Sequence, residues 1–113
     1  MKSTTRMEGD LAVLVLSGKL MGGPDAEEVG RRVNECLDQG TRKILIDVGD
    51  VSWVSSSGLG ILISAQTRVV RAGAVLKLSR VTHRLRQIFM VTKLHLVFDS
   101  YETNEEALRS FAE

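Results

Sequence analysis

Three consecutive serines, Ser55, Ser56 and Ser57, stand between two apolar stretches in the segment "VSWVSSSGLGIL" (51–62). A serine hydroxyl can cap a helix, act as a nucleophile or accept a phosphoryl group. One capping serine is enough to satisfy a free backbone N–H at a helix start. The run therefore predicts one capping serine and leaves at least one hydroxyl for another role.

The segment after the serines is suited to hold a phosphate. Residues 58–73 contain no acidic residue, although acids in the first turn usually complement the helix dipole. A helix start with free N–H groups, glycines and no competing carboxylate can bind a phosphate. Asp47 and Asp50 lie just before the serines, so we expect an added phosphate to be repelled and to affect a bound partner more than the fold.

Sequence patterns of intrinsic catalysis are missing around the serines. Ser56 has Gly58 two residues after it but Val54 two residues before it, so the Gly-x-Ser-x-Gly pattern fails. The "GLG" at 58–60 lacks the third glycine of a dinucleotide-binding loop, because Ile63 stands there, and no Gly-Lys-Ser/Thr phosphate loop occurs. We therefore expect a protein that is not an enzyme and uses no cofactor.

Other reactive side chains are few. Cys36 is the single cysteine, and its place on an apolar helix stripe predicts a core residue rather than a reactive thiol. His83 and His95 have no companion cysteines, so no metal site is expected, and both histidines are expected at the surface or in packing roles. A solvated face, rather than an anion site, is expected for the basic group Arg80, His83, Arg84 and Arg86.

The length of 113 residues predicts one domain, 1–113, with a real core. Fifteen basic residues nearly balance fourteen acidic ones, so we expect no direct binding of nucleic acid through bulk charge. No apolar run approaches the roughly 18 to 20 residues that span a bilayer, and the N-terminal residues lack the apolar middle of a signal peptide. We expect a cytoplasmic domain with no membrane contact.

Two hydrophobic periodicities alternate along the chain and predict the elements that position the serines. Continuous apolar, β-branched runs predict buried strands, and a weaker strand precedes them and ends in the turn Gly9-Asp10. Apolar residues spaced by three and four predict helices. The expected strands are 3–10, 11–18, 42–51, 74–79 and 96–100, and the expected helices are 22–40, 58–73, 82–94 and 103–113.

Capping signals support these helices. Pro24 suits a first helical turn, and Gly40 can end the same helix in a left-handed conformation. Thr82 is expected to cap 82–94, and Thr103 and Glu106 have the spacing of a capping box. The residues expected to face the core are Ala26, Val29, Val33, Cys36, Leu37, Leu85, Ile88, Phe89, Ala107, Leu108 and Phe111.

The alternation of strands and helices predicts an α/β fold with about five strands and about four helices. Right-handed crossovers would make the sheet mixed and mostly parallel, with an antiparallel N-terminal edge strand. Ligand sites in such sheets lie at the carboxyl ends of the strands. The serine run follows the 42–51 strand and so stands at such an end.

The segment "IDVGDVSWVSSSGLGIL" (46–62) resembles the central motif of the STAS-domain anti-sigma factor antagonists, in which a strand leads to Asp-Ser-Ser/Thr-Gly-Leu-Gly and a helix. The likeness covers nearly the whole chain, with "VLSGKL" before the first helix, "GAVLKLSRVTHRLRQIFMVTKL" after the motif and "EEAL" near the end. The resemblance implies a STAS-type single domain.

The resemblance also implies a partner switch. Unphosphorylated members of this family bind an anti-sigma factor that is also a serine kinase, and so free a sigma factor for transcription, for example in a stress response. The kinase phosphorylates the serine two residues before the motif glycine, which ends the association, and a metal-dependent serine phosphatase reverses the modification. The matching acceptor is Ser56, with Ser57 and Ser55 as alternatives.

The chain departs from the family pattern at two places. Ser55 stands where the family usually has aspartate, and the loop "MGGPD" (21–25) follows "SGKL" where an aspartate often comes at once. Loss of the carboxylate at position 55 makes the helix start more open to phosphate. It also favours a second hypothesis, a STAS interaction or scaffold module that is never phosphorylated, and small-ligand or nucleotide binding at the same loop is a third.

The partner-binding surface is predicted from its place at this end of the sheet. Trp53 is the only tryptophan, and we expect it to pack in the core, with the role of an interface anchor as the alternative. The predicted partner-binding residues are Met21, Gly22, Gly23, Asp25, Trp53, Ser55, Ser57, Gly58 and Leu59. The chain itself is expected to be a monomer or a weak homodimer.

Overall fold

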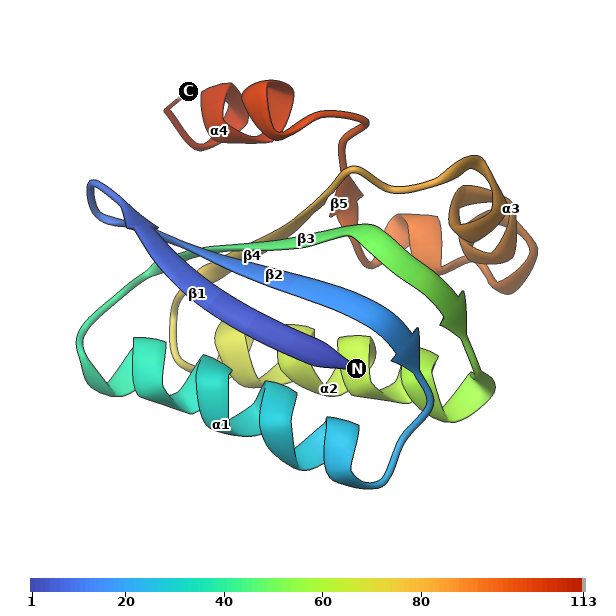
Figure 1. Cartoon of the computed structure of the whole chain (residues 1–113). Coiled ribbons are helices and arrows are strands. Elements are labelled where there is room, and N and C mark those ends of the chain that lie inside the picture. The colour runs from blue at the N-terminus through green and yellow to red at the C-terminus, as the bar shows by residue number, and fades with distance from the viewer. Residues whose placement is uncertain (113) are drawn as a thin grey trace.

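A computed structural model, which describes residues 1–112, shows a five-stranded sheet with helices on both faces (Figure 1). Within this range the strands are β1 (Lys2–Glu8), β2 (Leu11–Leu20), β3 (Lys43–Val54), β4 (Val75–Ser79) and β5 (Asp99–Ser100). The helices are α1 (Pro24–Asp38), α2 (Ser56–Arg71), α3 (His83–Thr92), the 3-10 turn η1 (Leu94–Leu96) and α4 (Asn104–Ala112). The predicted α/β class is confirmed.

The sheet has the order β1-β2-β3-β4-β5. The first two strands are antiparallel and joined by the two-residue turn Gly9-Asp10, in which Gly9 has a φ of 63°. The other neighbouring pairs are parallel. The predicted mixed sheet with an antiparallel N-terminal edge strand is therefore confirmed, and it directs the ends of β2 and β3 toward the same side of the molecule.

The main core lies between the sheet and the two helices α1 and α2. It includes the alternating residues of β2 and the apolar stripe of α1, where Cys36 is only 7% exposed. Burial raises the pKa of the Cys36 thiol, which agrees with its predicted role in the core. A smaller cluster under α4 contains Val13, Leu45 and Ala107 on the opposite face of the sheet.

Two predicted helix caps are present. The Thr82 hydroxyl accepts a hydrogen bond from the backbone N–H of Leu85 at 3.2 Å, and the Thr103 hydroxyl accepts one from that of Glu106 at 3.1 Å. Gly40 has a φ of 86°, as expected for a left-handed residue after a helix. Local sequence signals thus place these helix ends.

Three predicted boundaries need correction. β3 continues to Val54 and α2 begins at Ser56, because Ser55 is the capping residue and Ser56 and Ser57 already belong to the helix. Most of the predicted strand 96–100 is not a strand, since only Asp99 and Ser100 pair with β4. Two residues expected to face the core do not do so, because Ala26 is exposed and Ile88 is only half-buried. Glu113, the last residue of the predicted 103–113 helix, lies outside the described residues.

No helix within residues 1–112 combines the length and the apolar character that a membrane span requires.

Candidate functional site

The start of α2 is packed directly against the end of β2. The backbone N–H of Ser55 donates to the Leu20 carbonyl at 3.1 Å. Gly58 is buried, and a Cβ atom at this position would overlap the same Leu20 carbonyl oxygen. Glycine at position 58 therefore allows the helix to begin in contact with the strand end, which gives the motif glycine a structural reason.

Ser55 is the capping serine. Its hydroxyl accepts a hydrogen bond from the Gly58 N–H at 3.0 Å and donates one to the Met21 carbonyl at 2.9 Å. Ser55 thus links the first turn of α2 to the loop that leads into α1. An aspartate could make the first of these bonds but not the second, because a carboxylate has no proton to donate.

Ser56 occupies the first position of α2 and is exposed. Among residues 1–112, the structure gives its hydroxyl no hydrogen-bond partner. The first turn of α2 contains no acidic residue. Ser57 is exposed as well, so Ser55 is the serine whose hydroxyl is used by the fold, and Ser56 and Ser57 both present accessible hydroxyls.

Ser57 faces the glycine loop before α1. A Cβ atom at Gly22 would lie 3.0 Å from the Ser57 Cβ atom, so the loop and the helix are in close contact. Gly22 and Gly23 have φ values of 118° and 57°, which an L residue rarely adopts. Asp25 accepts a hydrogen bond from the Met21 N–H at 3.0 Å and holds this loop from the side of α1.

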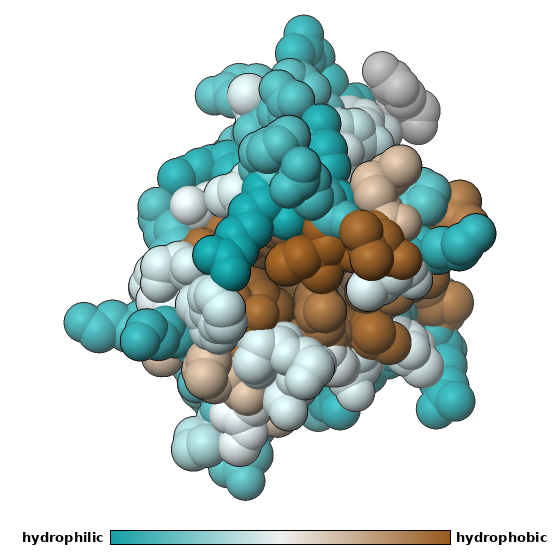
Figure 2. Space-filling model, turned by 90° about the vertical axis from the view of Figure 1, so that its right-hand side faces the viewer, coloured by the Kyte–Doolittle hydropathy of each residue, from teal (hydrophilic) through white to brown (hydrophobic). Residues whose placement is uncertain are grey.

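These contacts bring most of the predicted partner-binding residues together at one end of the molecule. The loop 21–25, the end of β3 and the first turn of α2 are its parts. Met21 is 48% exposed there, and Leu59 is half-buried. Figure 2 looks at this end and shows an apolar area surrounded by neutral and hydrophilic residues.

Trp53 corrects one prediction. Its side chain is 42% exposed, so the expectation that it packs in the core is wrong. The indole lies at the end of β3, with the Arg84 guanidinium 4.4 Å from the ring centroid. This cation–π pair joins β3 to α3 at the surface. The structure thus adds Arg84 to the residues around the site, as a neighbour that no sequence spacing indicated.

The two aspartates before the serines are already paired. Asp47 is buried and Asp50 is exposed, and their carboxylates lie 3.3 Å and 3.0 Å from the Arg80 guanidinium. Asp50 also precedes Val54 by four residues, which is about 13 Å along a strand. Arg80 therefore offsets part of the negative charge of the two carboxylates, and the repulsion of a phosphate on Ser56 stays a prediction.

The predicted basic group does not form one continuous face. Arg80 pairs with the two aspartates of β3, Arg84 covers Trp53, and Arg86 pairs with Glu102 at 3.1 Å. The sequence contains no acidic residue between Asp50 and Asp99. The end of β3, α2 and α3 therefore carry only basic ionised side chains, a signal that a count of charge along the chain could have found.

A cavity of about 300 Å³ lies between α1 and α2, next to the serines. Small residues of both helices form most of its walls, and Arg68 also lines it. Ser57 contributes to the wall nearest the glycine loop. This is the place that the small-ligand hypothesis would use.

Comparison with known proteins agrees with this architecture. The family model described as STAS domain matches residues 3–107. BtrV of Bordetella bronchiseptica, provisionally named an anti-sigma factor antagonist, is 22% identical over 111 residues, which cover 98% of this chain and 95% of BtrV.

Solved structures show the same fold. A provisionally named anti-sigma factor antagonist from Thermotoga maritima, TM1081, has a TM-score of 0.87 and 20% identity, with 98% of this chain and 95% of that chain covered. Phosphorylated SpoIIAA from Bacillus has a TM-score of 0.74 and 20% identity, with coverage of 97% and 99%. The match of the family model over residues 3–107 shows that this chain belongs to the STAS domain family.

Proposed function

We propose that this chain is an anti-sigma factor antagonist that works by partner switching and is not an enzyme. In its unphosphorylated form it binds a kinase-type anti-sigma factor in the cytoplasm and frees a sigma factor. Phosphorylation of Ser56 ends the association, and a metal-dependent serine phosphatase restores it. The names of BtrV, TM1081 and SpoIIAA support the antagonist role, and SpoIIAA has been solved in a phosphorylated form.

The observation that best supports the proposal is the difference in role between two of the serines. Ser55 caps the helix and holds the neighbouring loop, whereas Ser56 is exposed at the first position of α2. A phosphate on Ser56 would meet the positive end of the helix dipole without a carboxylate in the same turn. The fold would tolerate the phosphate, so its effect would fall on the bound partner.

The partner surface around Ser56 combines apolar and basic groups. Met21 and Trp53 are exposed large side chains on either side of the α2 start, and Arg84 lies on the indole. Aromatic and arginine side chains frequently dominate binding energy at protein interfaces. A dianionic phosphate at this place would add negative charge to the contact surface and would so weaken the fit of a partner that binds the neutral serine.

The test compares Ser56→Ala and Ser56→Asp in binding to the kinase-type anti-sigma factor of the same organism, measured by calorimetry. Ser56→Ala should bind like the unphosphorylated chain, and Ser56→Asp should bind at least about tenfold more weakly, which is about 1.4 kcal/mol. Thr67→Asp, an exposed position later on α2, is the matched control and should bind normally. Equal affinity of the two Ser56 variants would remove this serine from the mechanism.

Ser55 supports a second candidate function, a STAS scaffold module that is never phosphorylated. Its hydroxyl makes two structural hydrogen bonds where the related family motif has an aspartate. Mass spectrometry after incubation with ATP and the candidate kinase separates the two functions. A gain of one phosphoryl group on Ser56 supports the switch, and no gain with any kinase of that cell supports the scaffold.

A further inference from the structure

The outer edge of β1 is a separate feature that the proposed function does not use. β1 is the first strand in the sheet order and, within residues 1–112, pairs only with β2, over all seven of its residues. An outer strand leaves one row of backbone N–H and C=O groups without strand partners, and such a row can pair with another chain. Most side chains of β1 are also exposed.

The hairpin determines which residues of β1 face outward. Its two-residue turn makes Glu8 and Leu11 the closing hydrogen-bonded pair. In an antiparallel pair, every second residue directs its backbone groups to the neighbouring strand. The even-numbered residues of β1 therefore bond to β2, and the outward N–H and C=O groups belong to Ser3, Thr5 and Met7.

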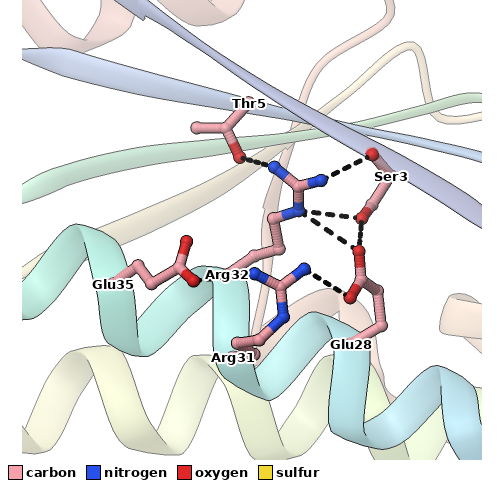
Figure 3. Close-up of polar contacts among 6 residues, drawn as sticks. All are labelled: Ser3, Thr5, Glu28, Arg31, Arg32 and Glu35. Carbon is pink, nitrogen blue, oxygen red and sulfur yellow. Dashed lines mark hydrogen bonds and ion pairs between the residues drawn. The ribbon is translucent and has the colours of Figure 1, made fainter.

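Arg32 of α1 covers part of this outer edge (Figure 3). Its Nη2 donates to the Ser3 carbonyl at 3.0 Å, and its Nε donates to the Ser3 hydroxyl at 3.0 Å. Its Nη1 donates to the Thr5 hydroxyl at 3.2 Å. One guanidinium thus binds the Ser3 carbonyl and the hydroxyls of Ser3 and Thr5. It lies beside the outward backbone groups with which an incoming strand would have to pair.

Glu28 fixes the position of Arg32. Its carboxylate lies 3.3 Å from the Arg32 Nε and accepts a hydrogen bond from the Ser3 hydroxyl. Arg31 also binds Glu28, at 2.6 Å, but its other contact is Glu35 on the same helix. Arg31 and Arg32 therefore share a partner on α1, while Arg32 alone of the two reaches β1 in the described structure.

The charges of β1 suit a second copy of the same strand. We consider two β1 strands that pair antiparallel about a two-fold axis at Thr5. Lys2 of each copy then lies opposite Glu8 of the other, which gives two pairs of opposite charge. The outward groups of Ser3 then face those of Met7. No like charges are directly opposite in this register, so the edge is complementary to itself.

We propose that the outer edge of β1 is a surface for pairing with a second copy of this chain and that Arg32 holds this surface closed. The two sheets would join into one continuous sheet through the backbone groups of Ser3, Thr5 and Met7. The proposal does not depend on Ser56 or on any anti-sigma factor.

The test measures the mass of Arg32→Ala by light scattering over a range of concentrations. The wild-type chain should remain at the monomer mass of 12.4 kDa, and Arg32→Ala should shift toward twice that mass. Arg31→Ala removes the same charge from the same helix without uncovering β1, and it should remain monomeric. Arg32→Lys keeps the charge but cannot make the three guanidinium hydrogen bonds to Ser3 and Thr5, so it should also dimerise. It replaces Arg32→Ala in the test if that variant fails to fold.

The double variant Arg32→Ala/Thr5→Pro tests the geometry. Proline at position 5 removes an outward N–H and leaves the β1–β2 hydrogen bonds intact, so it should restore the monomer. Hydrogen exchange should show protection of the Thr5 and Met7 amides in the Arg32→Ala dimer only. A folded Arg32→Ala chain that stays monomeric, a dimer that persists in the double variant, or a dimeric wild-type chain would each overturn the proposal.

Discussion

The two helices under the sheet, α1 and α2, begin at the same end of the molecule and run in the same direction, but their first turns differ in charge (Figure 1). The first turn of α1 contains Asp25 and Glu27, and Asp25 lies 3.7 Å from the N-terminal ammonium group. The first turn of α2 contains no acid and has an exposed serine. Both helix starts favour negative charge, but only α1 supplies it from its own residues.

This difference separates a structural helix start from one that can be regulated. At α1 the acid is part of the folded state, where it binds the Met21 N–H and fixes the loop before the helix. At α2 a hydroxyl stands where an anion would be stabilised, so charge can be added after folding. The following variants would sharpen this contrast or break it, and they are ordered by the size of the expected effect.

The largest effect is expected from Gly58→Ala. The added methyl group would overlap the Leu20 carbonyl, and such overpacking against backbone costs about 3 kcal/mol. Gly60→Ala is the control, because Gly60 is also helical and a Cβ atom there would meet no other atom within 4 Å. It should stabilise the domain by about 0.5–1 kcal/mol, since alanine favours helices. Urea unfolding measures both values, and equal midpoints would show that α2 does not begin in contact with β2.

Ser55→Ala should lower the free energy of unfolding by about 1 kcal/mol, the usual loss for a helix cap. Ser55→Asp should keep the bond from the Gly58 N–H and lose the bond to the Met21 carbonyl. Its stability should therefore lie between that of the wild-type chain and that of Ser55→Ala. Chemical denaturation of the three proteins checks this order. If Ser55→Asp were as unstable as Ser55→Ala, the link to the Met21 loop would matter more than the cap.

Ser56→Asp should stabilise the domain by about 0.3–1 kcal/mol, because it adds negative charge to the empty first turn of α2. Ser56→Lys should have the opposite sign, and both effects should shrink in high salt. Thermal unfolding at two salt concentrations measures them. A destabilising Ser56→Asp would contradict the contrast between α1 and α2, because the start of α2 would then not favour an anion.

The smallest effect concerns Glu28 and acid pH. Hydrogen bonds from Ser3 and then Arg31 lower the pKa of Glu28 from 4.5 to about 2. Because the folded pKa is below the unfolded one, this contribution to stability is complete above about pH 4.5 and is lost as the pH falls toward 2. Melting temperatures of the wild-type chain should fall through this range more steeply than those of Glu28→Gln. Parallel curves would show that the network in Figure 3 does not couple to folding.

Much of the fold could be predicted because its signals are local. The hairpin turn at Gly9, the caps Thr82 and Thr103, and the alternation of strand and helix patterns each depend on a few neighbouring residues. The strand predicted at 96–100 failed because an apolar run does not report whether a neighbouring strand is within reach, and only two of its residues pair with β4.

The candidate site was predicted only in part. Glycine and serine spacing placed the serine run at the end of a strand and the start of a helix, where the structure has it. The second bond of the capping serine, from the Ser55 hydroxyl to the Met21 carbonyl, joins residues 34 positions apart and could not be predicted from spacing. Trp53 was expected inside because tryptophan is large and apolar, whereas its exposure depends on how far β3 extends beyond the core.

Local patterns in the chain were sufficient to specify the α/β class, the antiparallel first strand and the helix caps, because periodicity and capping act between residues close in sequence. Three other contacts became visible only in the folded molecule: Gly58 touches Leu20, Arg84 covers Trp53 and Arg32 covers the edge of β1. Each of these contacts joins segments far apart in the chain. Their geometry depends on the packing of the whole sheet against its helices, which no local pattern encodes.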